Sequence, residues 1–278
     1  MSIQDIRNSI SQEVIGIQSK KVFLVEGSDD KAAFTILFNR FLPLWERHWG
    51  IAVAGNNAVG NKRQLLELLK LEPDWVGIVD RDEWDQPVID QYMSDRSNLC
   101  VLPRFCIENY LIHPVELWPA IPAIRQEKVA GGESTFTAAI VGELYQYLRH
   151  GALWKVVTPL WSGLRAIGFK EALASEKSLE TVQSDSEIKR ILCEWDSFLE
   201  PVRIFADFQT EFSKAQVAPI TEQFSIWIHG KVFWKNVVYP IMKKQVGQMK
   251  EVELRKQILR LIPKPVDLQS LFDRLNVG

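Results

Sequence analysis

The sequence predicts an α/β fold, in which a mainly parallel sheet flanked by helices is followed by a mostly α-helical C-terminal region. Between residues 20 and 102, short β-branched runs alternate with amphipathic helical patterns, which is typical of parallel strands joined by crossover helices. Further along, apolar residues recur at helical spacing over the stretches 133–150, 160–178, 185–214 and 230–262. We therefore expect a sheet domain at 1–125 and a mainly helical domain at 126–278 that packs on it.

The first strand, turn and helix are predicted over residues 21–41. Residues 21–26 form a β-branched run that ends in Glu26, and a Gly-Ser turn follows. Apolar residues then recur at helical spacing, and Ser28 is a suitable cap for this helix. Asp30 lies in the first helical turn, where the helix dipole favours an acidic side chain.

Three further strands complete the predicted sheet. Residues 51–54 form a short apolar strand, which an Asn-rich turn at 55–60 connects to a leucine-rich helix. Residues 75–80 form a third apolar strand that again ends in an acid, Asp80. Residues 98–102 form a fourth strand, which ends at a proline.

The composition excludes several classes of protein. The 278 residues are 46% hydrophobic and carry 33 basic against 35 acidic side chains, unlike a disordered, collagen-like or low-complexity chain. No apolar run approaches the ~18 residues of a membrane span, so we expect no membrane association. The first residues show no signal peptide, and the three cysteines have neither zinc nor disulfide spacing. We therefore expect a soluble protein of the reducing cytoplasm.

Two segments of opposite charge occur in a chain whose net charge is −2. Residues 71–95 hold eight acidic side chains and one basic one, whereas residues 231–260 hold eight basic and two acidic ones. Charge runs of this kind are most often solvated faces. The alternative is a cation site beside a track for a phosphate backbone. Trp234 and Tyr239 would then stack on unpaired bases, although core packing is the more common role for such residues.

Acidic side chains at two strand ends predict a metal site. Glu26 and Asp80 both follow strands, and in an open parallel sheet the ligand crevice lies outside the carboxyl ends of the strands. If the chain stays extended beyond Asp80, Asp82 points to the same side, and Asp30 reaches the crevice from one helical turn away. Such a cluster repels itself unless a cation neutralises it, and its hard oxygen ligands suit Mg²⁺ or Mn²⁺.

Three motifs resemble those of a known family. Residues 25–30 (Val-Glu-Gly-Ser-Asp-Asp) and 78–82 (Ile-Val-Asp-Arg-Asp) resemble the two motifs of the Toprim domain of topoisomerases, primases and overcoming-lysogenization-defect (OLD) nucleases. Residues 104–111 (Arg-Phe-Cys-Ile-Glu-Asn-Tyr-Leu) resemble a segment of the OLD-like group, particularly Toprim proteins encoded beside an ABC-type ATPase in phage defence. Among these proteins, the chain resembles the nuclease subunit of PARIS-type defence systems. The resemblance covers residues 20–115 and implies a Toprim-like, Rossmann-like fold.

The resemblance also implies roles for the acids in these motifs. Glu26 would be catalytic, binding metal or shuttling a proton, and Asp80 and Asp82 would be metal ligands. Asp30 matches an acid that assists the metal site in the nuclease branch. Glu108 would be a further catalytic acid that approaches the site from the next strand. The implied cofactor is Mg²⁺ or Mn²⁺.

Two lysines receive different assignments. Residues 228–231 (Ile-His-Gly-Lys) resemble a Gly-Lys pair of the same proteins, which implies that Lys231 is catalytic and stabilises charge on the phosphate. By contrast, Lys62 lacks the glycine spacing and the Ser or Thr partner of a Walker loop, so we expect no intrinsic ATPase activity. The sequence assigns Lys62 no other role.

The function that the resemblance implies is a divalent-metal-dependent nuclease, which hydrolyses phosphodiester bonds in RNA or DNA and serves as an antiphage effector with an ABC-type ATPase partner. Transfer RNA is a candidate substrate. Because 278 residues cannot hold the additional domains of a topoisomerase or primase, hydrolysis is favoured. The alternative is a non-catalytic, metal-binding regulatory subunit of such an ATPase complex. Whether the chain forms a homo-oligomer stays open.

Overall fold

The structure is a computed structural model, and it describes residues 2–55, 61–166 and 184–275. Two predicted segments fall partly outside this range. Of the Asn-rich turn at 55–60 only Gly55 is described, and the helix predicted at 160–178 is described only as far as residue 166.

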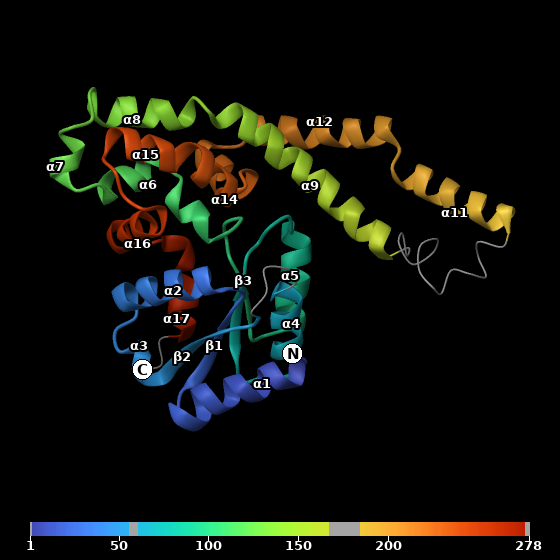
Figure 1. The fold of residues 1–278 in the computed structure, drawn as a ribbon, viewed down its shortest axis with the longest axis horizontal. Coiled ribbons are helices and arrows are strands. Elements are labelled where there is room, and N and C mark those ends of the chain that lie inside the picture. The colour runs from blue at the N-terminus through green and yellow to red at the C-terminus, as the bar shows by residue number, and fades with distance from the viewer. Residues whose placement is uncertain (1, 56–60, 167–183, 276–278) are drawn as a thin grey trace. The chain divides into compact units, whose positions relative to one another are not determined.

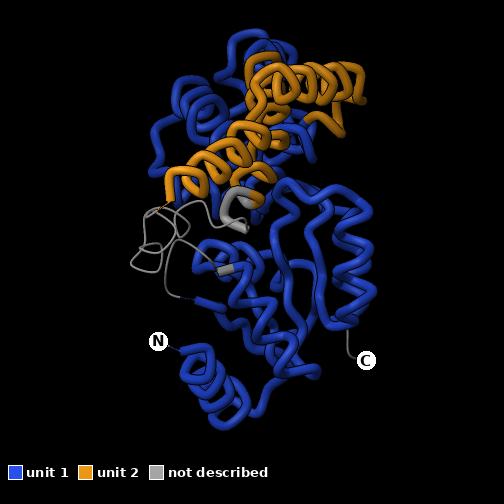
Figure 2. The backbone as a smooth tube through the Cα atoms, turned by 90° about the vertical axis from the view of Figure 1, so that its right-hand side faces the viewer, with its two compact units in different colours: residues 1–144, 224–278 blue, residues 145–223 orange. Residues whose placement is uncertain are grey.

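The chain forms two compact units (Figure 2). The first contains residues 1–144 and 224–278, and the second contains residues 145–223. These boundaries differ from the predicted division at residue 125, because the chain returns to the sheet unit at residue 224.

The sheet confirms the predicted α/β class. It has four parallel strands within the described residues, at β1 (Lys21–Val25), β2 (Trp49–Val53), β3 (Val76–Val79) and β4 (Leu99–Val101). All four lie where the sequence predicts strands. Their order in the sheet is β2-β1-β3-β4, so β1 pairs with β2 on one side and with β3 on the other. The strand order therefore reverses between β1 and β3, which is where open α/β sheets bind their ligands.

Helices surround this sheet. In the first unit they are α1 (Ile3–Ile10), α2 (Ser28–Phe41), α3 (Trp45–His48), α4 (Asn61–Leu71), α5 (Gln86–Asp95), α6 (Pro114–Leu117), α7 (Ala123–Gln126), α8 (Gly132–Val141), α14 (Gly230–Phe233), α15 (Tyr239–Gln245), α16 (Glu251–Leu261) and α17 (Gln269–Leu275). Shorter 3-10 or π-helical turns are η1 (Ser11–Ile17), η2 (Ile107–Leu111), η3 (Trp118–Ala120), η6 (Gln223–Trp227), η7 (Trp234–Val238) and η8 (Val266–Leu268).

Alternating side chains of β1 serve two cores, one on each face of the sheet. Val22 and Leu24 pack with α4, whereas Phe23 packs edge-on against Phe34 and Phe38 of α2. Figure 1 shows α2 and α17 on one face of the sheet and α4 and α5 on the other. This two-sided burial accounts for the nearly continuous apolar sequence of the strands.

The C-terminal residues close the core on the α2 face. Phe272 of α17 packs against Phe38, with ring centroids 6.5 Å apart, and the Trp49 indole donates a 3.0 Å hydrogen bond to the Leu275 carbonyl. Arg40 donates two hydrogen bonds to carbonyl oxygens at the end of α16. These contacts explain why residues 224–278 belong to the sheet unit and not to a separate helical domain.

The second unit is helical, as predicted. Its described helices are α9 (Leu144–Ala166), α11 (Asp185–Phe198), α12 (Pro201–Val217) and α13 (Ile220–Glu222). The predicted helix at 185–214 is divided at Pro201, which occupies the first turn of α12. Within this unit Arg149 lies over the rings of Phe208 and Phe212, and Lys155 pairs with Glu211 at 3.1 Å.

None of the helices in the described ranges combines the length and the apolar character that crossing a bilayer requires.

Replacing Phe272 by alanine tests the closure of the core by α17. Phe272 is 1% exposed, so Phe272→Ala should lower the free energy of unfolding by about 3–5 kcal/mol in a urea titration. The matched control is Val266→Ala, because Val266 lies in the same C-terminal segment and is 84% exposed. The control should change stability by less than about 0.5 kcal/mol. Equal effects of the two substitutions would contradict this packing.

Candidate metal-binding site

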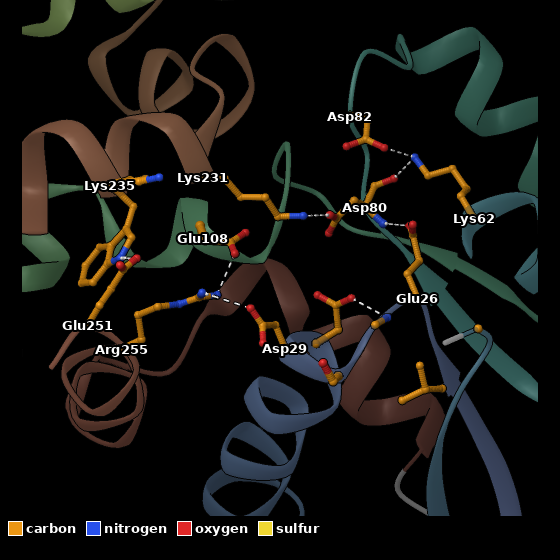
Figure 3. A pocket seen from close by; sticks show the side chains of 16 residues that line it. Glu26, Asp29, Lys62, Asp80, Asp82, Glu108, Lys231, Lys235, Glu251 and Arg255 are labelled. Atoms are coloured by element: carbon orange, nitrogen blue, oxygen red, sulfur yellow. Dashed lines mark hydrogen bonds and ion pairs between the residues drawn. The ribbon is translucent and has the colours of Figure 1, made fainter. Parts of the chain in front are cut away.

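A cavity of about 960 Å³ lies at the carboxyl ends of β1 and β3 (Figure 3). The residues that follow these two strands line it, together with the start of α2 and parts of α4, α14 and α16. The position coincides with the point where the strand order reverses. The topology therefore places the cavity where the crevice was expected from the sequence.

Glu26 and Asp80 are joined directly. The Asp80 amide donates a 2.9 Å hydrogen bond to Oε1 of Glu26, across the ends of two adjacent strands. Asp80 is buried, with 7% of its surface exposed. Two of the predicted metal ligands thus lie side by side at the strand ends.

Asp82 is held differently from the expectation. The extended conformation ends at Val79, and Asp82 has a φ of 51°, in the left-handed region that non-glycine residues rarely adopt. Its amide donates a 2.8 Å hydrogen bond to the Phe105 carbonyl. The extended conformation on which the predicted direction of Asp82 depended is therefore not present, because the chain turns immediately after Val79.

The side chain that meets Asp82 is Lys62, from the first turn of α4. Its Nζ pairs with the Asp82 carboxylate and donates a 2.6 Å hydrogen bond to the Asp80 carbonyl (Figure 3). It also lies 4.5 Å from the ring centroid of Trp84. Sequence reasoning missed this role because it compared Lys62 only with a Walker loop. The signal that could have found it is the position of Lys62 just after β2, at the carboxyl edge of the sheet.

Lys231 reaches the site from α14. Its Nζ lies 3.5 Å from Oδ2 of Asp80, and 53% of its side chain is exposed. Asn109 and Gly230, which belong to the motifs at 104–111 and 228–231, fix the position of Lys231. Asn109 donates hydrogen bonds of 2.7 and 3.0 Å to the carbonyls of Phe224 and Ile228, just before α14. A Cβ atom on Gly230 would lie 2.2 Å from Oδ1 of Asn109, so only glycine allows this close approach.

Asp30 and Glu108 line the same cavity. Asp30 Oδ2 accepts a 2.9 Å hydrogen bond from the Gly27 amide at the start of α2. Glu108, in η2, accepts a 2.6 Å hydrogen bond from Arg255, which also lies 3.3 Å from Asp29. Oε2 of Glu108 is buried and has no hydrogen-bond partner among the described residues. Sequence analysis placed Arg255 only in the basic segment 231–260 and did not select it as a residue of this site.

Burial and mutual repulsion raise the pKa values of the acids of this site. Burial raises the pKa of Glu26 from 4.5 to about 7, and the carboxylates of Asp82 and Asp30 add to this shift. Burial likewise raises the pKa of Asp30 to about 6 and the pKa of Asp80 well above its usual value. Burial alone would lower the pKa of Lys231, but the carboxylates of Asp80 and Glu108 raise it above its usual value. The site therefore holds more negative charge than its lysines neutralise.

The acids suit a cation in chemistry but do not form a complete ligand set as they stand. In the part of the chain that the structure describes, no three His, Cys, Asp or Glu side chains converge closely enough to hold a metal ion. Glu26 and Asp80 supply adjacent hard oxygen donors in a buried, negatively charged cavity, which suits Mg²⁺ or Mn²⁺. Lys62 and Lys231 occupy the remaining positions around them.

A basic groove adjoins this cavity, lined by Lys235, Tyr239, Lys243 and Lys244 among others. Lys235 also lines the cavity itself, so the two are continuous. None of the three lysines forms an ion pair within the described ranges. Trp234, by contrast, is 1% exposed and donates a hydrogen bond to Glu251, so it is a core residue and is not available to stack on bases.

Comparison of the sequence with protein-family models and with curated proteins finds no match.

The raised pKa values predict that the metal-free chain loses stability as the pH rises. Glu26 and Asp30 bind protons more tightly in the folded state than in the unfolded state, so their contribution is complete below about pH 4 and is lost as the pH rises through about 6 to 7. Each unit by which folding raises a pKa contributes about 1.4 kcal/mol to the free energy of unfolding at low pH. Thermal unfolding in chelator between pH 5 and 8 should show this decline.

The variant Glu26→Gln should flatten that decline, because it removes one of the carboxyl groups whose pKa is raised while keeping an oxygen for the Asp80 amide. Glu67→Gln, which removes an exposed carboxylate of α4, serves as the control and should follow the wild-type curve. A wild-type stability that stays constant or rises over this range would show that the strand-end acids are not held as described.

Proposed function

We propose that this chain is a Mg²⁺- or Mn²⁺-dependent nuclease that hydrolyses phosphodiester bonds in RNA or DNA. One observation carries the proposal: Glu26 and Asp80 are hydrogen-bonded to each other at the switch point of the parallel sheet, and the ammonium group of Lys231 lies beside them. The resemblance of residues 25–30 and 78–82 to Toprim motifs supports the same function.

Within this proposal, Glu26 and Asp80 hold the divalent ion. When bound, such an ion orients a phosphate and lowers the pKa of a water molecule that attacks it. Lys231 lies on the open side of Asp80, half exposed to the cavity, where it can contact a phosphate oxygen and stabilise the negative charge that develops there. Asn109 acts as a positioning residue, because its hydrogen bonds fix the chain before α14.

The basic groove supports a polymeric substrate. Lys62, Lys231 and Arg255 are each paired with a carboxylate, whereas Lys235, Lys243 and Lys244 of the groove form no ion pair with any residue that the structure describes. Free ammonium groups beside a reaction site attract a phosphate backbone and account for affinity without selecting a sequence. A substrate longer than one nucleotide would extend from the cavity into this groove.

The biological setting follows from the resemblance alone. Likeness to Toprim proteins encoded beside ABC-type ATPases supports an antiphage effector in the cytoplasm with such an ATPase as partner, and transfer RNA as a candidate substrate. The second candidate function is a non-catalytic, metal-binding subunit of the same complex. The observation that favours it is the pairing of Asp80, Asp82 and Glu108 with basic side chains.

Cleavage assays on labelled transfer RNA, single-stranded DNA and duplex DNA test the enzyme directly. The wild type should cut at least one substrate with Mg²⁺ or Mn²⁺ and none with chelator. Glu26→Gln should reduce this activity by about 10²–10³, because it removes a charged ligand, whereas the control Glu67→Gln should cut as the wild type does. Metal binding without turnover, with or without the ATPase, would favour the non-catalytic subunit instead.

The groove makes a separate prediction about nucleic-acid binding. The double variant Lys243→Ala/Lys244→Ala should weaken the binding of a labelled single-stranded oligonucleotide and lower the salt dependence of log K by about 0.7 for each lost phosphate contact. Fluorescence anisotropy between 50 and 200 mM salt measures both quantities. Lys189→Ala/Lys214→Ala, which removes two lysines from the second unit, is the control. Equal salt slopes for the two double variants would exclude the groove from binding.

A further inference from the structure

Lys62 occupies the Asp82 side of the cavity. Its Nζ is bonded to the Asp82 carboxylate and to the Asp80 carbonyl at 2.6 Å, so it bridges the two residues of the second Toprim-like motif. The ring of Trp84 covers it at 4.5 Å, and only 19% of the Lys62 side chain is exposed. A buried ammonium with three such partners is firmly placed.

The surroundings of Lys62 hold it in that position. Its helix, α4, packs on β3 through Leu65 and Leu69, and a Cβ atom on Gly77 would lie 2.9 Å from Leu69. Trp84 is itself stacked on Tyr92, with ring centroids 4.4 Å apart. Moving the ammonium away from Asp82 would therefore expose a buried charge and break its contact with the Trp84 ring.

The charge at the strand ends matches one divalent ion. Four carboxylates and two ammonium groups line the cavity there: Glu26, Asp30, Asp80 and Asp82 with Lys62 and Lys231. Glu108 is paired separately with Arg255. The fully ionised group has an excess of two negative charges, which a single divalent cation neutralises. A second divalent cation would leave an excess of two positive charges with Lys62 in place, and of one positive charge without it.

We propose that the ammonium group of Lys62 takes the place of a second metal ion on the Asp82 side of the site. The chain then binds one divalent ion, at Glu26 and Asp80, whereas a two-metal site binds two. This inference rests on the proposed function, because it takes the metal site as given. A second ion would lie roughly 3.5–4 Å from the first and would need the carboxylate that Lys62 holds. Lys62 is then a positioning and specificity residue that sets the number of ions.

Counting bound Mn²⁺ tests the inference without any activity measurement. Electron paramagnetic resonance of the full chain, titrated with Mn²⁺, should give one bound ion for the wild type. Lys62→Met keeps an unbranched side chain near Trp84 but removes the positive charge. The variant protein should therefore bind two ions, and it should bind the first ion about tenfold more tightly than the wild type does. The double variant Lys62→Met/Asp82→Asn should return to one ion. Lys70→Met, an exposed lysine of the same helix, is the matched control and should bind one.

The outcomes separate this inference from the proposed function. Two ions in the wild type, or one ion in Lys62→Met, would overturn the role of Lys62 and leave a metal site in place. No bound ion in any variant would overturn the metal site itself, and with it the nuclease proposal. Circular dichroism shows whether Lys62→Met is folded, and if it is not, the count for the wild type decides alone.

Discussion

The hydrogen bond from the Asp80 amide to the Glu26 carboxylate is the contact on which the site depends. It ties together the ends of β1 and β3, the two neighbouring strands between which the chain order reverses. No crossover helix covers the carboxyl edge at such a point, so polar groups meet there in a cavity that stays open to a ligand. A carboxylate buried at this position must be neutralised by protons, by lysines or by a metal ion, and the structure shows lysines beside Asp80 and Asp82.

Basic side chains from distant parts of the chain share that neutralisation. Lys62 comes from the helix before β3, whereas Lys231 and Arg255 come from the C-terminal segment that returns to the sheet after the second unit. Asn109 and Gly230 fix the position of this returning segment. The Asn109 side chain donates a hydrogen bond to the Phe224 carbonyl, and Gly230, which has no side chain, leaves room for it. Fold and chemistry are therefore coupled: the segment that completes the core also delivers the cation to Asp80.

The parts of this structure that follow from local pattern could be predicted. Apolar runs located the four strands, two of which end in an acid, and the rule for parallel sheets placed Glu26 and Asp80 at one edge. What pattern could not supply was the turn after Val79, because the left-handed conformation of Asp82 depends on its hydrogen bond to the Phe105 carbonyl. Lys62 and Arg255 were missed because their partners, Asp82 and Glu108, are brought to them only by the tertiary fold.

The position of a bound metal ion is the most direct test of the central claim, that Glu26 and Asp80 form a divalent-cation site. We would grow crystals of the full chain with Mn²⁺ and record anomalous scattering at the manganese edge. The expected result is a single anomalous peak between the carboxylates of Glu26 and Asp80, with Lys62 still on Asp82. Crystals saturated with Mn²⁺ but lacking a peak at these two residues would contradict it.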